Sequence, residues 1–155
     1  MANPLKMLKL KATGIQFILE IPIEASPRIV WATILNTPAW FGFDDDRSRW
    51  PKQTFEAWPG GRWVMEHPGG PSYLFATITQ VEPEKLLRLS GSMGMNHLPV
   101  SGAVIFELQP RKDGKTTLLR VGTRMFGYLD KDVKKRYQSG WKKLFAQLKS
   151  AAEGR

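Results

Sequence analysis

The most constraining feature of this sequence is a series of short apolar and polar alternations from Phe55 to Met125, broken at intervals by turn-forming residues. The breaks are rich in proline, glycine and acidic residues, and they fall at residues 59–61, 67–71, 82–85 and 113–114. In Leu119–Met125 the odd positions carry apolar side chains or threonine, and the even positions carry arginine or glycine. The pattern predicts an antiparallel meander with one covered face and one solvated face.

A helix from Asp130 to the C-terminus is the predicted cover of this sheet. Apolar residues recur there at steps of three and four, which places them on one stripe: Val133, Tyr137, Trp141, Leu144, Leu148 and Ala151. Asp130 is suited to cap a helix of about 22 residues, roughly 33 Å long. Four lysines lie opposite the stripe: Lys131, Lys135, Lys142 and Lys149. Gly140 is unfavourable inside a helix, and we expect it to let the helix approach the sheet closely.

Before the meander, the sequence predicts one strand and two short helices. The strand spans Gln16–Ile23, and Pro22 places it at a sheet edge or a bulge, because proline donates no backbone hydrogen bond. Ser26 and Pro27 begin the first helix as its cap and first residue, and Thr37-Pro38 restarts a second helical turn. The predicted fold class is therefore α+β, with about six to seven antiparallel strands, two short helices after the first strand and a long C-terminal helix.

Length and composition restrict the chemistry further. A chain of 155 residues predicts a single domain spanning residues 1–155, in which residues 1–9 are either poorly ordered or extend the first strand. The absence of cysteine excludes disulfides and a thiolate nucleophile, and two histidines alone argue against a metal site. No nucleophile-elbow motif is present. We therefore expect no cofactor, no metal and no catalytic residue.

The formal net charge of +9, from 23 Lys and Arg against 14 Asp and Glu, is unusual. Such a charge attracts anionic partners over about 8 Å at physiological salt, and an acidic protein is one candidate. No aromatic residue interleaves with the helix lysines to stack bases, so a nucleic-acid partner is not expected. Without a secretory signal or a run of 18 apolar residues, the sequence predicts a cytoplasmic protein that does not insert stably into membranes. A monomer or weak dimer is expected.

The order of these elements resembles that of the START-like superfamily, also called SRPBCC, and four segments carry the likeness. They are Ile23–Ala32, Trp58–Trp63, Ala76–Leu86 and Gly140–Leu148, and they are most similar to the subfamily of the activator of the heat-shock-protein-90 ATPase. The resemblance implies a helix-grip fold, as in the birch-pollen allergen, with a curved sheet wrapped around the C-terminal helix. It also implies a ligand cavity between them. The superfamily includes lipid carriers and many uncharacterised bacterial proteins.

The cavity implied by this resemblance is expected to have apolar walls with a few polar groups. Alternation along Arg62–His67 places His67 on the same face as two large apolar side chains, and Tyr73 and Thr77 are expected to share the inner face of the next strand. Two irregular loops, residues 42–51 and 91–102, are expected to flank the entrance. The candidate cavity-lining residues are Trp31, Trp40, Trp63, Met65, His67, Tyr73, Phe106, Val121, Thr123, Met125, Tyr137, Trp141 and Leu144.

Three functions are compatible with the sequence. The first is non-catalytic binding of a small hydrophobic or aromatic molecule in the cavity. The second is a co-chaperone-like interaction module whose basic surface, including Lys135 and Lys142, binds an acidic partner. The third is a cyclase-type enzyme in which Glu66, His67 or Tyr137 moves a proton.

Overall fold

The computed structural model describes residues 4–155. Residues 4–12 belong to no helix or strand, and the first strand begins at Thr13. Of the segment expected to be poorly ordered or to extend that strand, residues 1–3 lie outside the described part of the chain.

Seven antiparallel strands form one sheet in the order β1-β7-β6-β5-β4-β3-β2. Strands β2 to β7 follow one another as a meander, and the last of them, β7, pairs with β1. Strand β1 is therefore an edge strand, and Pro22 lies in it as predicted. The strands are β1 (Thr13–Ile23), β2 (Lys52–Phe55), β3 (Arg62–Glu66), β4 (Ser72–Glu82), β5 (Leu86–Gly91), β6 (Val100–Pro110) and β7 (Thr117–Gly127).

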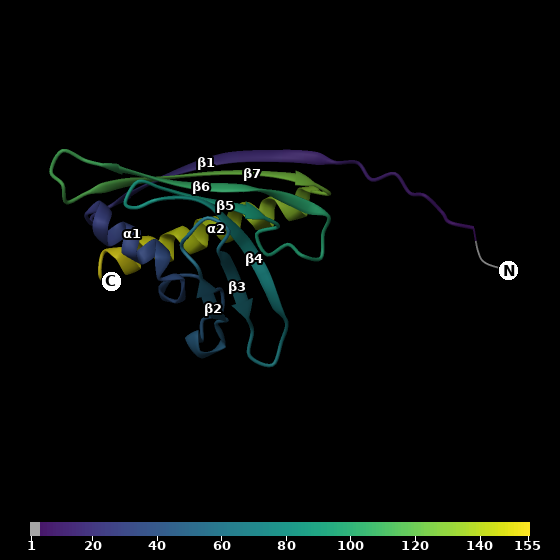
Figure 1. The fold of residues 1–155 in the computed structure, drawn as a ribbon, viewed down its shortest axis with the longest axis horizontal. Helices are drawn as coiled ribbons and strands as arrows, with labels where there is room; N and C mark the ends of the chain where they lie inside the picture. Colours follow the sequence, from purple (N-terminus) through teal and green to yellow (C-terminus); the bar gives the residue numbers. More distant parts are fainter. Residues whose placement is uncertain (1–3) are drawn as a thin grey trace.

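Two irregularities in strand pairing accompany the curvature of the sheet. The register shifts between Trp63 and Val64 where β3 pairs with β4, and between Ile78 and Gln80 where β4 pairs with β5. Bulges of this kind increase the local twist and bend of a strand. Figure 1 shows β2, β3 and β4 turning down and away from the flatter layer of β1, β7 and β6.

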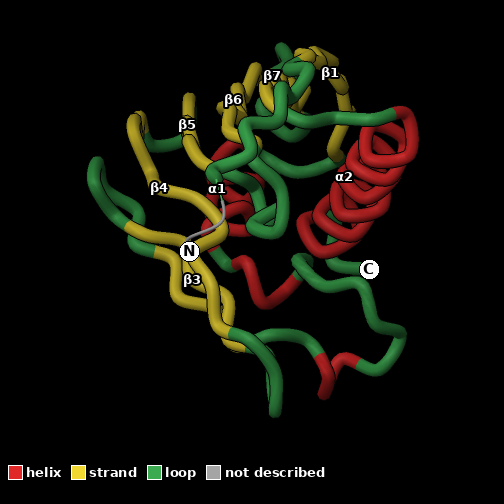
Figure 2. The backbone as a smooth tube through the Cα atoms, turned by 90° about the vertical axis from the view of Figure 1, so that its right-hand side faces the viewer, coloured by secondary structure: helices red, strands yellow, loops and turns green. Residues whose placement is uncertain are grey.

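Helix α2 (Lys131–Ala152) has the predicted 22 residues and lies on the concave side of the sheet (Figure 2). The Asp130 side chain caps it by accepting a hydrogen bond from the Val133 N–H at 2.8 Å. Its buried side chains are Val133, Tyr137, Trp141, Leu144, Phe145, Leu148 and Ala152. Five of the six predicted stripe positions are thus buried; Ala151 is only half-buried, and the neighbouring Ala152 is buried in its place. Within residues 4–155, neither α2 nor any other helix has the length and apolar character needed to cross a membrane.

The two short helical segments after β1 differ in kind. Helix α1 (Pro27–Leu35) begins as predicted, with the Ser26 hydroxyl accepting a hydrogen bond from the Ile29 N–H at 3.4 Å. The second segment, η1 (Thr37–Ala39), is a single 3₁₀ turn. It delivers Trp40 into the core, where the indole N–H donates to the Thr33 carbonyl at 3.0 Å. A second 3₁₀ turn, η2 (Arg47–Arg49), lies in the loop that follows.

The core fills the space between the inner face of the sheet and the helices. Its largest side chains are almost completely inaccessible; Trp40, Trp63 and Phe106 are each at most 1% exposed. Burial of such a side chain contributes about 1.5–3 kcal/mol relative to leaving it in water. Large buried side chains therefore make up the layer between sheet and helix.

Candidate ligand-binding cleft

An apolar cleft with a volume of about 190 Å³ opens beside the N-terminal half of α2. Strand β4 and the two irregular loops predicted to flank an entrance supply the other walls. The lining residues are Phe41, Phe43, Tyr73, Phe75, Met93, Gly94, Met95, Arg136, Tyr137, Gly140, Trp141 and Leu144. Four separate parts of the chain thus meet around one apolar space.

The loop of residues 42–51 is held against α2 by side chains of that helix. Lys143 donates from Nζ to the Phe43 carbonyl at 3.0 Å. Gln147 donates from Nε2 to the Gly42 carbonyl at 2.9 Å and to the Trp40 carbonyl at 2.7 Å. A Cβ atom at Gly42 would lie 2.0 Å from the Trp50 ring, so only glycine fits at this position. These contacts fix the position from which Phe43 reaches the cleft.

The β5–β6 loop forms the opposite wall through a tight turn. Gly94 has a φ of +83°, a conformation that favours glycine, and a Cβ there would lie 3.2 Å from the Phe75 ring. The Ser92 hydroxyl and the Asn96 side-chain carbonyl form a hydrogen bond across the turn. As a result Met93 is buried beside the cleft, and Met95 lines it half-exposed.

Edge-to-face aromatic contacts connect these walls. The ring centroids of Phe41 and Phe75 lie 4.9 Å apart with an interplanar angle of 75°, and Phe41 is 6.2 Å from Trp141. The Phe75 ring also packs on the buried Trp63 at 4.5 Å. Such pairs contribute about 0.5–1.5 kcal/mol beyond their buried area. The cleft wall is therefore continuous with the rigid aromatic core.

Two tyrosines near the cleft already use their hydroxyl groups. The Tyr137 hydroxyl bonds to Thr123 Oγ1 at 2.7 Å, and burial raises the pKa of Tyr137 although the hydrogen bonds to Thr123 and Trp141 act the other way. The Tyr73 hydroxyl lies 3.2 Å from Nε2 of His67, and burial raises the pKa of Tyr73. Both phenols are therefore neutral at physiological pH.

Two further hollows adjoin the cleft and share residues with it. One, of about 390 Å³, continues past Phe41, Phe43 and Tyr73 to His67 and the loop of residues 42–51. The other, of about 220 Å³, shares Met95, Arg136 and Tyr137 with the cleft, and the rest of its lining is His97, Leu98 and Val133. The cleft therefore shares part of its walls with each of the two hollows.

Five of the thirteen predicted lining residues lie at these openings. Tyr73, Tyr137, Trp141 and Leu144 line the cleft, and His67 lines the adjoining hollow. The others are packed in the core, among them Thr123, which bonds to Tyr137. They are Trp31, Trp40, Trp63, Met65, Phe106, Val121, Thr123 and Met125. Contact of any of the thirteen with a ligand stays a prediction.

Several lining residues were not identified from the sequence. Phe43 and Met95 lie in the loops expected to flank the entrance, but no sequence pattern shows which loop side chains turn inward. Phe75 could have been predicted, because it lies two residues after Tyr73 in the same strand and alternation places both on one face. After Phe75 that alternation breaks: Ala76 and Ile78 are buried and Thr77 is only half-buried, so the expected inner position of Thr77 is wrong.

Gly140 also differs from its predicted role. A Cβ atom there would lie 3.6 Å from the nearest atom of the Phe43 ring, an ordinary van der Waals contact, and it would meet no sheet residue within 4 Å. The glycine therefore faces the loop of residues 42–51 across the cleft and does not bring α2 close to the sheet. Its missing side chain leaves part of the cleft open.

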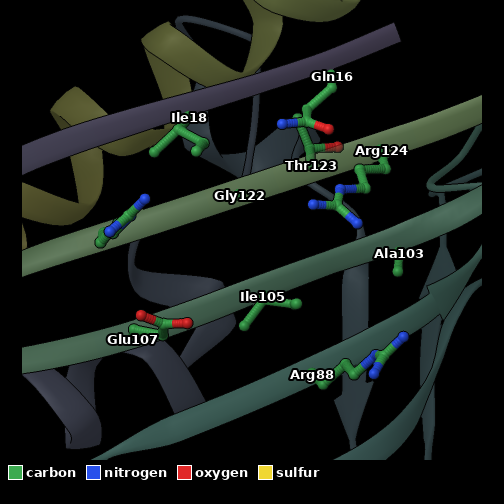
Figure 3. A pocket seen from close by; sticks show the side chains of 10 residues that line it. Gln16, Ile18, Arg88, Ala103, Ile105, Glu107, Gly122, Thr123 and Arg124 are labelled. Carbon is green, nitrogen blue, oxygen red and sulfur yellow. The ribbon is translucent and has the colours of Figure 1, made fainter. Parts of the chain in front are cut away.

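A different hollow, of about 290 Å³, lies on the outer face of the sheet around Gly122 (Figure 3). A Cβ atom on Gly122 would meet nothing within 4 Å. Charged side chains rise around it from strands β5, β6 and β7, and strand β1 completes the wall. The lining is Gln16, Ile18, Arg88, Ala103, Ile105, Glu107, Arg120, Gly122, Thr123 and Arg124.

Within residues 4–155, no cluster of three or more His, Cys, Asp or Glu side chains is suited to hold a metal ion.

Solved structures similar to this chain share its fold. Protein Mll3558 from Rhizobium loti is 19% identical, with 90% of this chain and 98% of that chain covered and a TM-score of 0.70. Ara h 8.0201 is 9% identical, with coverage of 92% and 100% and a TM-score of 0.68. A norcoclaurine synthase point mutant from Thalictrum flavum is 10% identical, with coverage of 93% and 97% and a TM-score of 0.62. These identities establish the fold alone.

A comparison with curated proteins gave no significant match. The sequence of residues 24–153, however, matches the family described as activator of Hsp90 ATPase homolog 1-like protein. That span runs from the end of β1 to the end of α2, and it includes every wall of the cleft. On this match, and on the helix-grip fold that carries it, the chain belongs to the activator of Hsp90 ATPase homolog 1-like family.

Proposed function

We propose that this protein binds a small hydrophobic or aromatic molecule in the cleft beside α2, without transforming it. The observation that carries the proposal is the lining: six of its twelve residues are aromatic, and Arg136 is the only formally charged one. Aromatic and methionine side chains are the usual walls of small-molecule sites. The fixed loop of residues 42–51 supports the proposal, because an apolar wall that is already ordered lowers the entropy cost of binding.

The size of the cleft limits the ligand. Drug-sized ligands occupy roughly 300–1,000 Å³, so a cleft of about 190 Å³ suits a molecule of one or two rings. A longer apolar chain requires one of the adjoining hollows, of about 390 Å³ and about 220 Å³. Each square ångström of apolar surface removed from water contributes about 25 cal/mol. We therefore expect modest affinity for a ligand confined to the cleft and higher affinity for one that extends beyond it.

The polar groups at the openings favour binding over catalysis. The hydroxyls of Tyr73 and Tyr137 are hydrogen-bonded to His67 and Thr123, and burial keeps both phenols protonated. A phenol that stays protonated cannot act as a general base toward a ligand. The lining of the cleft itself contains no carboxylate, histidine or nucleophilic serine.

An amide NMR titration with the neutral probe 2-naphthamide tests the proposal. We expect saturable shifts that cluster on Met93–Met95 and on Arg136–Trp141, the two stretches that face each other across the cleft. Shifts scattered over the surface, or confined to the outer face around Gly122, contradict the proposal.

A matched pair of plugging variants locates the site. Gly140→Leu places a side chain in the cleft next to Phe43 without removing any core residue, and we expect at least about a tenfold loss of affinity for the probe. Gly122→Leu fills the outer hollow instead, where no atom opposes the new side chain, and affinity should stay within about twofold. Equal losses in both variants, or no loss in Gly140→Leu, would show that the probe binds elsewhere.

A further inference from the structure

Arg136 differs from every other polar side chain at the cleft in having no partner. The cleft and the adjoining hollow of His97 and Leu98 share this residue, and it is the only Lys, Arg, Asp or Glu in either lining. Within residues 4–155, no carboxylate lies within 4.0 Å of its guanidinium. By contrast, Arg49 in the other hollow is 3.9 Å from the carboxylates of both Asp44 and Asp46.

The two phenol hydroxyls of the lining already have partners. The Tyr137 hydroxyl is turned to Thr123, and the Tyr73 hydroxyl to His67. Polar recognition of a cleft ligand by a side chain therefore falls to Arg136. A guanidinium presents several N–H donors in a planar fork that matches a carboxylate, and it remains charged at every physiological pH.

The helix geometry leaves room for such a pairing. Arg136 directly precedes the buried Tyr137 in α2. It lies four residues before Gly140, so the two positions are neighbours on one face of the helix. Because position 140 has no side chain, it places nothing between Arg136 and the Phe43 ring, and all three residues line the same cleft. A ligand with its apolar body between the aromatic walls can therefore place its head against Arg136 at the edge of the cleft.

From these observations we infer that the ligand of the cleft is an apolar acid, a small aromatic or aliphatic molecule with one carboxylate that pairs with Arg136. The inference rests on the proposed function and adds the chemical class of its ligand. Arg136 is exposed, so solvent weakens the ion pair, and the expected gain is about five- to tenfold in affinity rather than the larger factor of a fully buried pair.

Two probes of the same shape separate the apolar contribution from the charge. The affinities of 2-naphthoate and 2-naphthamide are measured by calorimetry at low salt for the wild type, Arg136→Gln and Lys135→Gln. Lys135 is the matched control, because it is the preceding exposed cation on α2 and lines neither the cleft nor the adjoining hollows. We expect Arg136→Gln to bind naphthoate about five- to tenfold more weakly and naphthamide within about twofold of the wild type. Lys135→Gln should leave both affinities unchanged.

The possible failures are distinguishable. If naphthamide binds the wild type but naphthoate affinity is the same in Arg136→Gln, the inference is wrong and the proposed function stands. If Lys135→Gln and Arg136→Gln weaken naphthoate equally, general surface charge explains the effect and the inference is again wrong. If neither probe binds the wild type, the proposed function fails and the inference fails with it. An amide spectrum of each variant verifies that it is folded.

Discussion

The cleft beside α2 and the hollow around Gly122 lie on opposite faces of one sheet, and they differ most in what bounds them. The outer hollow is the larger, at about 290 Å³ against about 190 Å³. Its walls, however, are side chains that rise from the sheet alone, and four of them are charged. The cleft is lined by a helix, a strand and two loops, and it has one charge. Volume alone therefore does not identify the better site for an apolar ligand.

The two sets of walls also differ in how firmly they are held. Arg88 and Arg124 on the outer face are exposed, and ordering a long side chain of this kind costs up to about 2 kcal/mol in rotamer freedom. Phe41 and Phe75 in the cleft are buried and packed edge to face against each other. A ligand of the cleft thus meets a surface that is already ordered, whereas a ligand of the outer hollow must first order its walls.

The largest expected effect contrasts two neighbouring residues of β7. Met125 points inward and is fully buried, whereas Phe126 points outward and is 65% exposed. Met125→Ala should lower the free energy of unfolding by about 2–5 kcal/mol, because it leaves a cavity in the core. Phe126→Ala should change it by about 0.5 kcal/mol, although it removes the larger side chain.

Urea denaturation of both variants measures this difference. Comparable losses of unfolding free energy in the two variants would mean that Phe126 is covered in the protein assembly. The contrast between a buried inner face and an exposed outer face of β7 would then not hold.

Filling each hollow with a small side chain should have smaller effects on stability. Gly122→Val replaces glycine in a strand interior with a β-branched residue whose Cβ meets no atom within 4 Å, and we expect a gain of about 0.5–1 kcal/mol. Gly140→Ala removes a helix-interior glycine, adds an ordinary contact with Phe43 and should gain about 1 kcal/mol.

The affinity for 2-naphthamide should differ between Gly122→Val and Gly140→Ala even if their stabilities are similar. Only Gly140→Ala narrows the cleft, so only it should weaken 2-naphthamide binding, by a few-fold. Thermal denaturation and calorimetry on the same samples test both expectations. A loss of stability in Gly122→Val would mean that the outer position is more crowded than the structure shows.

The same contrast explains which parts of the molecule the sequence predicts. Regular alternation and helical spacing determine which side chains are buried where an element is regular. Residues 119–125 of β7 and the stripe of α2 therefore follow their patterns closely. The cap at Asp130 and the edge position of Pro22 depend on the chemistry of single residues, so the sequence predicts them equally well.

The cleft is less predictable because it lies where the regular patterns stop. The register shifts around β4 change which alternate positions of the strand point inward after Phe75. No residue type in that strand indicates this change. The contacts of Lys143 and Gln147 with carbonyls about a hundred residues earlier are long-range, and a helix pattern alone shows these residues only as solvent-facing. Sequence spacing therefore located the loops but not the side chains that they contribute.

The hydroxyl pair of Tyr137 and Thr123 on the inner face makes stability depend on pH. Burial raises the pKa of Tyr137 in the folded protein above the value of about 10 for an unfolded chain. Below pH 10 both states hold the proton, and the stabilising contribution is complete. As the pH rises from about 10 towards the folded pKa, the unfolded state loses its proton first, so stability falls. Tyr137→Phe removes this dependence, together with about 1 kcal/mol from the hydrogen bond.

The difference in unfolding free energy between wild type and Tyr137→Phe should therefore be constant from pH 8 to about pH 10 and should narrow above it. Every other titratable group is common to both proteins, so its contribution cancels in the difference. A difference that stays constant to pH 11 would show that the Tyr137 hydroxyl is as accessible to water in the folded protein as in the unfolded chain. In that case the cleft would reach deeper than Trp141, and the boundary between packed core and open cleft would have to move inward to Thr123.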